Sequence, residues 1–138
     1  MGTAWLLAGM DARSHLTSVD SDSKAQEVAR RHLGHDARVT FHLGDGGACS
    51  RPIARPAVRS DLCRRLAAAS SRILEQTLAL LKEGGIYFVD DLLPQPSWPD
   101  GHAAKVPPLI ARLEDQRGFI ATGSRGLQGL MMLVRTSI

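Results

Sequence analysis

Four aspartates follow stretches of this 138-residue sequence that are typical of β-strands: Asp20, Asp45, Asp90 and Asp91. A carboxylate offers only hydrogen-bond acceptors, so it suits the hydroxyl and amino groups of a ligand, and it also suits a hard cation. In an open α/β sheet, ligands bind beyond the carboxyl ends of the strands. We therefore predict that the binding site of this protein is built around these four side chains.

The segments around the aspartates alternate between strand-like and helix-like patterns. Strands are predicted at 16–20, 38–43 and 86–90, helices at 3–10, 24–33, 60–82 and 103–116, and an antiparallel hairpin at 118–122 and 129–135. Strands that alternate with helices favour a mainly parallel sheet. The sequence thus predicts one α/β domain over residues 1–138, with the antiparallel hairpin at its C-terminal end.

The net charge of +3 is concentrated in residues 50–72, which hold six arginines and one aspartate, whereas the rest holds 11 basic and 13 acidic residues. This stretch contains no aromatic residue, so stacking on bases gives no support for nucleic-acid binding. No apolar run approaches the roughly 20 residues of a membrane span, and no secretory leader is recognised, which predicts a cytoplasmic protein. Cys49 and Cys63 lack the spacing of metal ligands and are expected to be free thiols.

Four motifs, taken in order, resemble class I S-adenosylmethionine-dependent methyltransferases, and in particular their small-molecule O-methyltransferase branch. The motifs are LTSVDSD at 16–22, VTFHLGD at 39–45, LLKEGGIYFVDD at 80–91 and GLMMLV at 129–134. The resemblance implies a Rossmann-like fold and S-adenosylmethionine as the cofactor. It also implies a small-molecule partner whose hydroxyl group accepts the methyl group.

The resemblance assigns residues to the cofactor as well. Asp20 matches the acid that binds both ribose hydroxyls, and Asp45 matches the residue that meets the adenine amino group. Two alternatives stay open, because Asp20 could instead cap the helix at 24–33 and Asp45 could simply be a turn residue. The remaining cofactor-binding residues in this prediction are Gly2, which matches the last glycine of the family's glycine-rich loop, Ser21 and Gly46.

The acids after the strand at 86–90 could serve the methyl acceptor. Asp90 and Asp91 match the place where metal-using members of the family hold a divalent ion, although those members carry Asp-Asn there. The alternative is that both aspartates only begin a loop. His102 and Lys105 lie in that loop and, together with Asp90, are the candidates for a catalytic base. Trp98, in the same loop, either lines the acceptor pocket or anchors the loop.

The sequence departs from the family pattern at two places. The family places its first strand, at the centre of the sheet, before the glycine-rich loop, and the sequence here starts at the end of that loop. The family's fourth strand should lie between 45 and 80, where the atypical basic segment 50–72 stands instead. We therefore expect the first and the fourth strands to be missing, and we expect the edge beside 86–89 to lower stability or to favour a homodimer.

The basic segment 50–72 has two explanations. A reading frame shifted by one base joins the last two bases of each codon to the first base of the next. From Ser50 onward, the genetic code then permits the amino-acid sequence LARLPDQRFDLIFADAWP. Its part FDLIFADA resembles the family's fourth strand, which favours a slip of the reading frame. The alternative is a true insertion that folds as a basic helix.

Two other classes of function stay open beside the methyltransferase. A remnant of the methyltransferase fold without catalysis could act as a binding or dimerisation module. A basic module could bind nucleic acid through the arginines of 50–72. Binding of S-adenosylmethionine would distinguish the enzyme from both alternatives.

Overall fold

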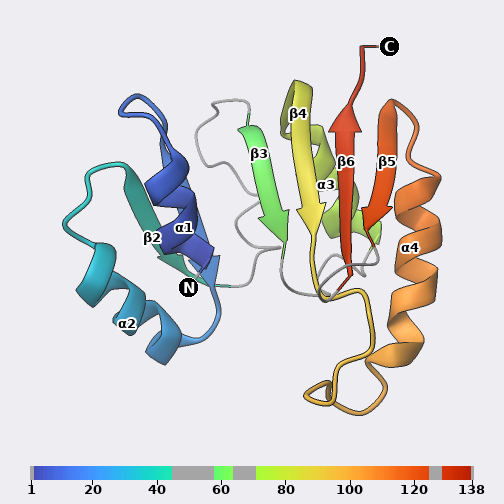
Figure 1. Ribbon diagram of the computed structural model, residues 1–138, viewed down its shortest axis with the longest axis horizontal. Helices are drawn as coiled ribbons and strands as arrows, with labels where there is room; N and C mark the ends of the chain where they lie inside the picture. The colour runs from blue at the N-terminus through green and yellow to red at the C-terminus, as the bar shows by residue number, and fades with distance from the viewer. Residues whose placement is uncertain (1, 45–57, 64–70, 125–128, 138) are drawn as a thin grey trace. The chain divides into compact units, whose positions relative to one another are not determined.

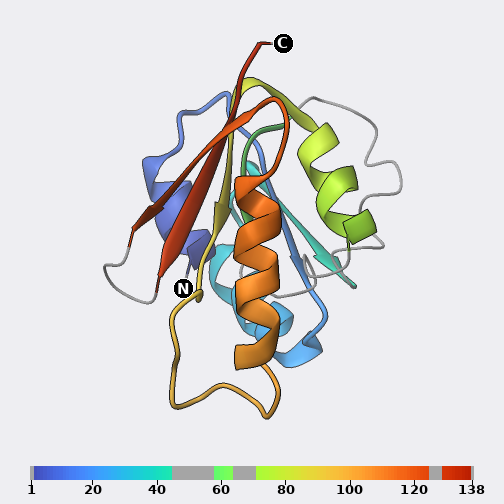
Figure 2. The same ribbon diagram turned by 90° about the vertical axis from the view of Figure 1, so that its right-hand side faces the viewer.

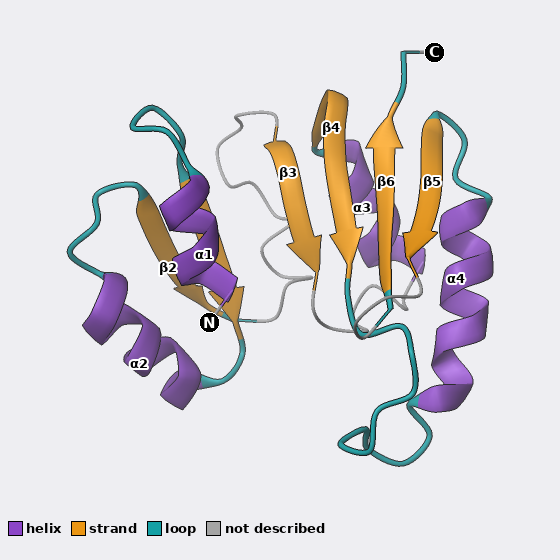
Figure 3. Ribbon diagram, in the orientation of Figure 1, coloured by secondary structure: helices purple, strands orange, loops and turns teal. Residues whose placement is uncertain are grey.

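The computed structural model describes residues 2–44, 58–63, 71–124 and 129–137. The chain forms two compact units, Met1–Ile53 and Ala54–Ile138, and each unit has a sheet of its own. Figure 1 labels the helices and strands along the chain, and Figure 3 distinguishes them by type. No helix in the described ranges is long and apolar enough to cross a membrane.

The first unit alternates helices with strands: α1 (Gly2–Gly9), β1 (Leu16–Asp20), α2 (Ser23–Leu33) and β2 (Val39–Leu43). β1 and β2 pair in parallel, with Leu16 opposite Val39 and Asp20 opposite Leu43. Parallel neighbours need a crossover connection, and α2 provides it. The strands predicted at 16–20 and 38–43 and the helix predicted at 24–33 are confirmed.

α2 begins and ends at residues that cap it. The Asp22 carboxylate accepts hydrogen bonds from the N–H groups of Lys24 and Ala25, at 2.9 and 3.2 Å. These are two of the N–H groups that the first turn of a helix leaves without a partner. At the other end the Gly34 N–H donates to the Arg30 carbonyl at 2.8 Å. The extent of α2 is therefore set by its own sequence.

The second unit contains a four-stranded sheet with the strand order β3-β4-β6-β5. β3 and β4 are parallel, and β6 is antiparallel to both β4 and β5. The elements in chain order are β3 (Val58–Cys63), α3 (Ser71–Ala79), β4 (Leu81–Val89), the 3-10 helix η2 (Ala103–Lys105), α4 (Val106–Glu114), β5 (Phe119–Ser124) and β6 (Leu130–Arg135).

One apolar core holds the second unit together. α3 contacts β4 and α4 contacts β5, and both helices lie on the same side of the sheet (Figures 1 and 2). The most deeply buried side chains are those of Leu74 in α3, Tyr87 in β4, Leu113 in α4 and Leu133 in β6. Because every one of these elements contributes to one core, burial of apolar area stabilises the unit as a whole.

The C-terminal hairpin and the helix before it agree with the sequence-based expectation. β5 and β6 pair antiparallel, with Phe119 opposite Arg135 and Ser124 opposite Leu130. α4 carries proline in its first turn, where the missing proline N–H costs nothing. Gly129, just before β6, has φ of +82°, and a Cβ there would lie 2.7 Å from the Leu93 backbone nitrogen, so this position requires glycine.

The prediction for residues 60–82 is wrong in its first part. We expected one long helix and no strand between 45 and 80, but residues 58–63 form β3, and the helix α3 spans only Ser71–Ala79. β3 pairs in parallel with β4, with Ser60 opposite Ile86 and Cys63 opposite Val89. Helix propensity is a small preference that tertiary context overrides, and here a ladder of backbone hydrogen bonds to β4 outweighs it. The place beside β4 that we expected to be empty is therefore occupied.

The prediction of one sheet for 16–20, 38–43 and 86–90 also needs correction. The described hydrogen bonds place β1 and β2 in one sheet and β4 in another. The two sheets are separate because no described strand pairs with both β1 and β3. The family pattern assigns that role to its central first strand. The parallel pairing within each unit and the antiparallel hairpin still give the α/β, Rossmann-like class that the sequence predicts.

Candidate functional site

The first part of the candidate site is the carboxyl end of β1 and β2. Asp20 is the last residue of β1, and its backbone carbonyl accepts a hydrogen bond from the Gly44 N–H at 2.9 Å. The two parallel strands therefore end at the same edge, with Asp20 beside the residue that follows β2. Asp45 and Gly46, the next two residues of the predicted site, lie outside the described residues.

The Asp20 carboxylate is held in place by the turn that follows it. Its Oδ1 accepts from the Asp22 N–H at 2.9 Å, and the side chain is half-buried. The alternative in which Asp20 caps α2 is wrong, because the Asp22 carboxylate performs that task. A carboxylate fixed through one oxygen still presents its second oxygen as an acceptor. Asp20 is thus positioned as a carboxylate that a ligand hydroxyl could meet.

Gly2 and Ser21 are the other two predicted cofactor residues of this unit. Gly2 is the first residue of α1, and a Cβ built on it would have no neighbour within 4 Å. The described structure therefore gives no steric reason for a glycine there. Ser21 lies exposed in the turn between Asp20 and Asp22.

Asp90 and Asp91 lie where the sequence places them, directly after β4. Asp91 has φ of +68°, a left-handed conformation that aspartate tolerates better than most residues. Its N–H donates to Asp90 Oδ1 at 2.8 Å, and both side chains are half-buried. In the described part of the chain, no group of three or more His, Cys, Asp and Glu side chains gathers to form a metal site.

The two other candidates for a catalytic base lie in different surroundings. His102 precedes η2, and its ring stands against the Trp98 ring with 4.4 Å between centroids and 41° between planes. Lys105 ends η2 and is exposed. The Lys105 N–H donates to the His102 carbonyl at 2.9 Å, but no side-chain hydrogen bond among described residues joins Asp90, His102 and Lys105. The structure therefore describes no assembled catalytic group.

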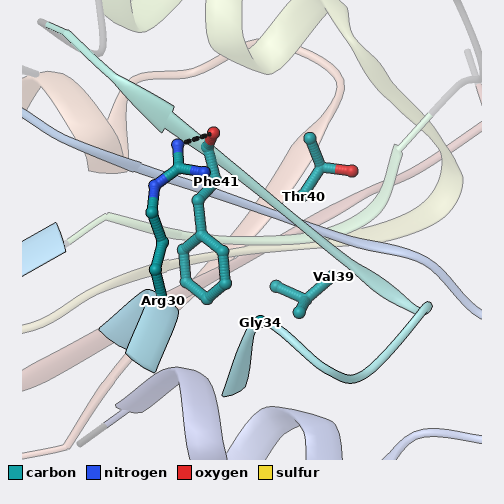
Figure 4. A pocket seen from close by; sticks show the side chains of 5 residues that line it. All are labelled: Arg30, Gly34, Val39, Thr40 and Phe41. Atoms are coloured by element: carbon teal, nitrogen blue, oxygen red, sulfur yellow. Dashed lines mark hydrogen bonds between the residues drawn. The ribbon is translucent and has the colours of Figure 1, made fainter. Parts of the chain in front are cut away.

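A pocket that no sequence motif predicts lies on the first unit, between the end of α2 and β2. It measures about 420 Å³ and is lined by Arg30, Gly34, Val39, Thr40 and Phe41. Figure 4 shows the Arg30 guanidinium alongside Phe41, where it donates to the Phe41 carbonyl and lies 5.5 Å from the ring centroid. The pocket contains none of the predicted aspartates, and its cation is already engaged with β2.

No family model matches the sequence, and no curated protein matches it. Solved structures do match. An O-methyltransferase from Bacillus cereus in complex with SAH superposes with a TM-score of 0.81 and 15% identity, over 97% of this chain and 68% of that one. The O-methyltransferase TomG from Streptomyces achromogenes, involved in tomaymycin synthesis and solved with SAM, gives 0.78 and 18%, over 98% and 68%.

A third structure, the SAH-bound methyltransferase PaMTH1 from Podospora anserina, gives a TM-score of 0.79 and 14% identity, over 99% of this chain and 67% of that one. This chain has the O-methyltransferase fold. The likeness extends over nearly all of the chain, although at 14–18% identity it concerns the fold alone. It agrees with the class I methyltransferase resemblance that the four sequence motifs carry. The chain spans about two thirds of the length of these three proteins.

Proposed function

We propose that this protein binds S-adenosylmethionine and belongs to the enzymes that transfer its methyl group to a hydroxyl of a small molecule. The single observation that carries this function is Asp20, at the shared carboxyl end of β1 and β2, with one oxygen fixed and the other available. Carboxylates at this edge of an α/β sheet suit the ribose diol of a nucleoside. The fold and its structural neighbours, two of them solved with SAH and one with SAM, support the same function.

The residues present fit the adenosine part of the cofactor. Asp20 would accept hydrogen bonds from the ribose hydroxyls, with Ser21 beside it and Gly2 near the methionine part. Asp45 and Gly46 would meet the adenine. Bound S-adenosylmethionine supplies a methyl group on a positively charged sulfur. The chain's own contribution is to hold that group and the acceptor hydroxyl in line, and positioning of this kind supplies much of the rate of such a transfer.

Asp90 is our proposed base for the acceptor hydroxyl. It follows β4 at the strand's carboxyl end, and one of its oxygens is taken by the Asp91 N–H while the other is available. His102 is less suitable, because its Nε2 is buried, and Lys105 is exposed on η2. The proposed reaction includes no step through a divalent ion, although Asp90 and Asp91 are the residues that would hold one.

The cofactor prediction is tested by two matched substitutions in one turn, Asp20→Asn and Asp22→Asn. Asparagine at position 20 can still accept from the Asp22 N–H but loses the negative charge and one acceptor for the ribose. We expect the affinity for SAH, measured by isothermal titration calorimetry, to fall about ten- to a hundredfold, as for the loss of a charged hydrogen bond.

Asp22→Asn is the control, because asparagine caps helices as well as aspartate does. Its affinity for SAH should stay within about twofold of the parent, in keeping with an equivalent cap. Equal affinities for both variants and the parent would remove Asp20 from the cofactor site. If the parent chain itself does not bind SAH, the proposed function is excluded for this chain.

A further inference from the structure

The segment 94–102, called here the strap, connects β4 to η2 and is only loosely attached to the second unit. Its hydrogen bonds to described residues are local and reach no further than three residues along the chain. They run from Gln95 Nε2 to the Leu93 carbonyl, from the Trp98 N–H to Gln95, from the His102 N–H to Pro99, and from the Lys105 N–H of η2 to the His102 carbonyl. The last hydrogen bond to a distant element is that of the Leu92 N–H with the Gly129 carbonyl, before the strap begins.

Trp98 is the side chain that fastens the strap. Its indole packs against the apolar core of the second unit, and it is the one strap residue described in that contact. The His102 ring lies against it at a tilt of 41°, from the end of the strap. The strap residues next to these two, Ser97, Pro99 and Gly101, are exposed. The attachment therefore depends on one indole and the imidazole beside it.

This fastening carries an energetic penalty. Trp98 Nε1 and His102 Nε2 are both buried, and neither has a hydrogen-bond partner among the described residues. Indole Nε1 is a donor only, and a buried donor with no acceptor loses its hydration without compensation. If the strap lifted away from the core, both nitrogens would reach water. Apolar burial of the indole thus favours the closed strap, and hydration of two nitrogens favours an open one.

The backbone allows such a movement as a unit. Pro94, Pro96 and Pro99 fix φ at three of the nine strap positions, so the strap is stiff between its ends. Gly101 has φ of +76°, with no atom within 4 Å of where a Cβ would lie, so the chain can turn there without collision.

We propose that residues 94–102 are a movable strap with Trp98 as its latch, closed in this structure and open when Trp98 Nε1 and His102 Nε2 become hydrated. The strap begins four residues after Asp90, at the carboxyl end of β4. Its opening would change access to that end of the sheet. The part of this inference that concerns access for a methyl acceptor rests on the proposed function, whereas the latch itself does not.

The test is His102→Phe in the full 138-residue chain carrying Trp5→Phe, so that Trp98 is the only tryptophan. Phenylalanine keeps a ring against the indole but removes the unpaired nitrogen. We expect hydrogen exchange of the Trp98 indole N–H, followed by NMR, to slow at least about fivefold because the closed state is favoured. His35→Phe, at an exposed position of the first unit, is the matched control and should leave that exchange unchanged.

Faster or unchanged exchange in His102→Phe would show that the imidazole nitrogen has a partner, such as a buried water, and would overturn the latch. A second variant tests the fastening. Trp98→Ala should speed backbone amide exchange within 94–102 while β4 and β6 stay protected. Loss of protection throughout β4 and β6 would show that Trp98 is part of the unit's core, and the strap would not move separately. Neither measurement needs S-adenosylmethionine, so both stand even if cofactor binding fails.

Discussion

Asp20 and Asp22 are separated by one serine, yet they have different tasks. Asp22 satisfies the first N–H groups of α2, and Asp20 accepts from the backbone of Asp22 itself. The sequence Val-Asp-Ser-Asp-Ser offers several residues that can cap a helix, so local preference could not separate a cap from a ligand carboxylate. The two roles are distinguished by which backbone N–H groups each carboxylate accepts from: Asp20 from Asp22, and Asp22 from Lys24 and Ala25. These positions depend on where β1 ends and α2 starts.

At the same scale, the pair formed by Asp36 and Arg38 makes the stability of the first unit depend on pH. Arg38 Nη2 lies 2.7 Å from Asp36 Oδ2, and Arg38 Nη1 donates to the Met10 carbonyl at 2.8 Å. The side-chain and backbone hydrogen bonds from Arg38 lower the pKa of Asp36 from 3.8 to about 2. The folded state therefore binds the Asp36 proton more weakly than the unfolded state.

The stabilisation from Asp36 should accordingly be complete above pH 4 and decline as the pH falls toward 2. We expect Asp36→Asn, which cannot ionise, to show a shallower loss of stability over this range than the parent. Denaturant unfolding between pH 5 and pH 2, followed by amide signals of β1 and β2, measures the difference. Parallel pH profiles for variant and parent would show that the ion pair does not contribute.

At the scale of elements, β3 is the segment where local pattern and structure disagree most. Residues 58–63 read Val-Arg-Ser-Asp-Leu-Cys and were expected to be coil and helix, but they form a strand parallel to β4. In the string permitted by the shifted reading frame, the letters FDLIFA fall on these same six positions. The agreement supports a strand at this place in the chain. A slip of the frame and a true insertion both stay open as its origin, but the basic helix expected of an insertion is wrong for residues 58–63.

The close contact between Gly129, just before β6, and Leu93, just after β4, can be tested by comparing alanine substitutions at two glycines. Gly129 and Gly101 both have positive φ, +82° and +76°, but only at Gly129 would a Cβ collide, with Leu93. Gly101→Ala should therefore show the cost of the backbone conformation alone, about 1 kcal/mol, and Gly129→Ala a larger loss of about 2–4 kcal/mol. Equal losses of unfolding free energy in urea would mean that Leu93 moves aside freely.

At the scale of the whole molecule, the two units differ in how much they bury. Among the described residues of the second unit, the core cluster contains 11 buried side chains. In the described part of the first unit, the buried side chains are those of Leu7, Gln26 and Phe41, while Trp5 is 77% exposed. Because apolar burial is the main source of stability, the two units should differ in their resistance to unfolding.

We expect native-state amide exchange to show this difference directly. The amides of β4 and β6 should be protected more strongly than those of β1 and β2, and unfolding in denaturant should not be a single transition. Equal protection of all four strands would instead indicate one cooperative structure. Size-exclusion chromatography over a range of concentrations would test the homodimer, which stays a prediction although β3 occupies the sheet edge from which it was argued.

The sequence by itself determined the features that depend on neighbours along the chain. The strands that end at Asp20 and Asp90, the helix capped within Asp20–Lys24 and the closing hairpin follow from periodicity, capping and turn chemistry over a few residues. The family resemblance of four short motifs gave the fold class, and the solved O-methyltransferases agree with it.

Only the tertiary structure decided the features that depend on partners far along the chain. Residues 58–63 became a strand because β4, more than 20 residues later, supplies the hydrogen-bond ladder. The division into two sheets and the contact between Trp98 and the core likewise depend on packing between distant residues. Helix and strand propensities differ by about 1 kcal/mol or less per residue, so such partners override them, and no local pattern records where those partners will be.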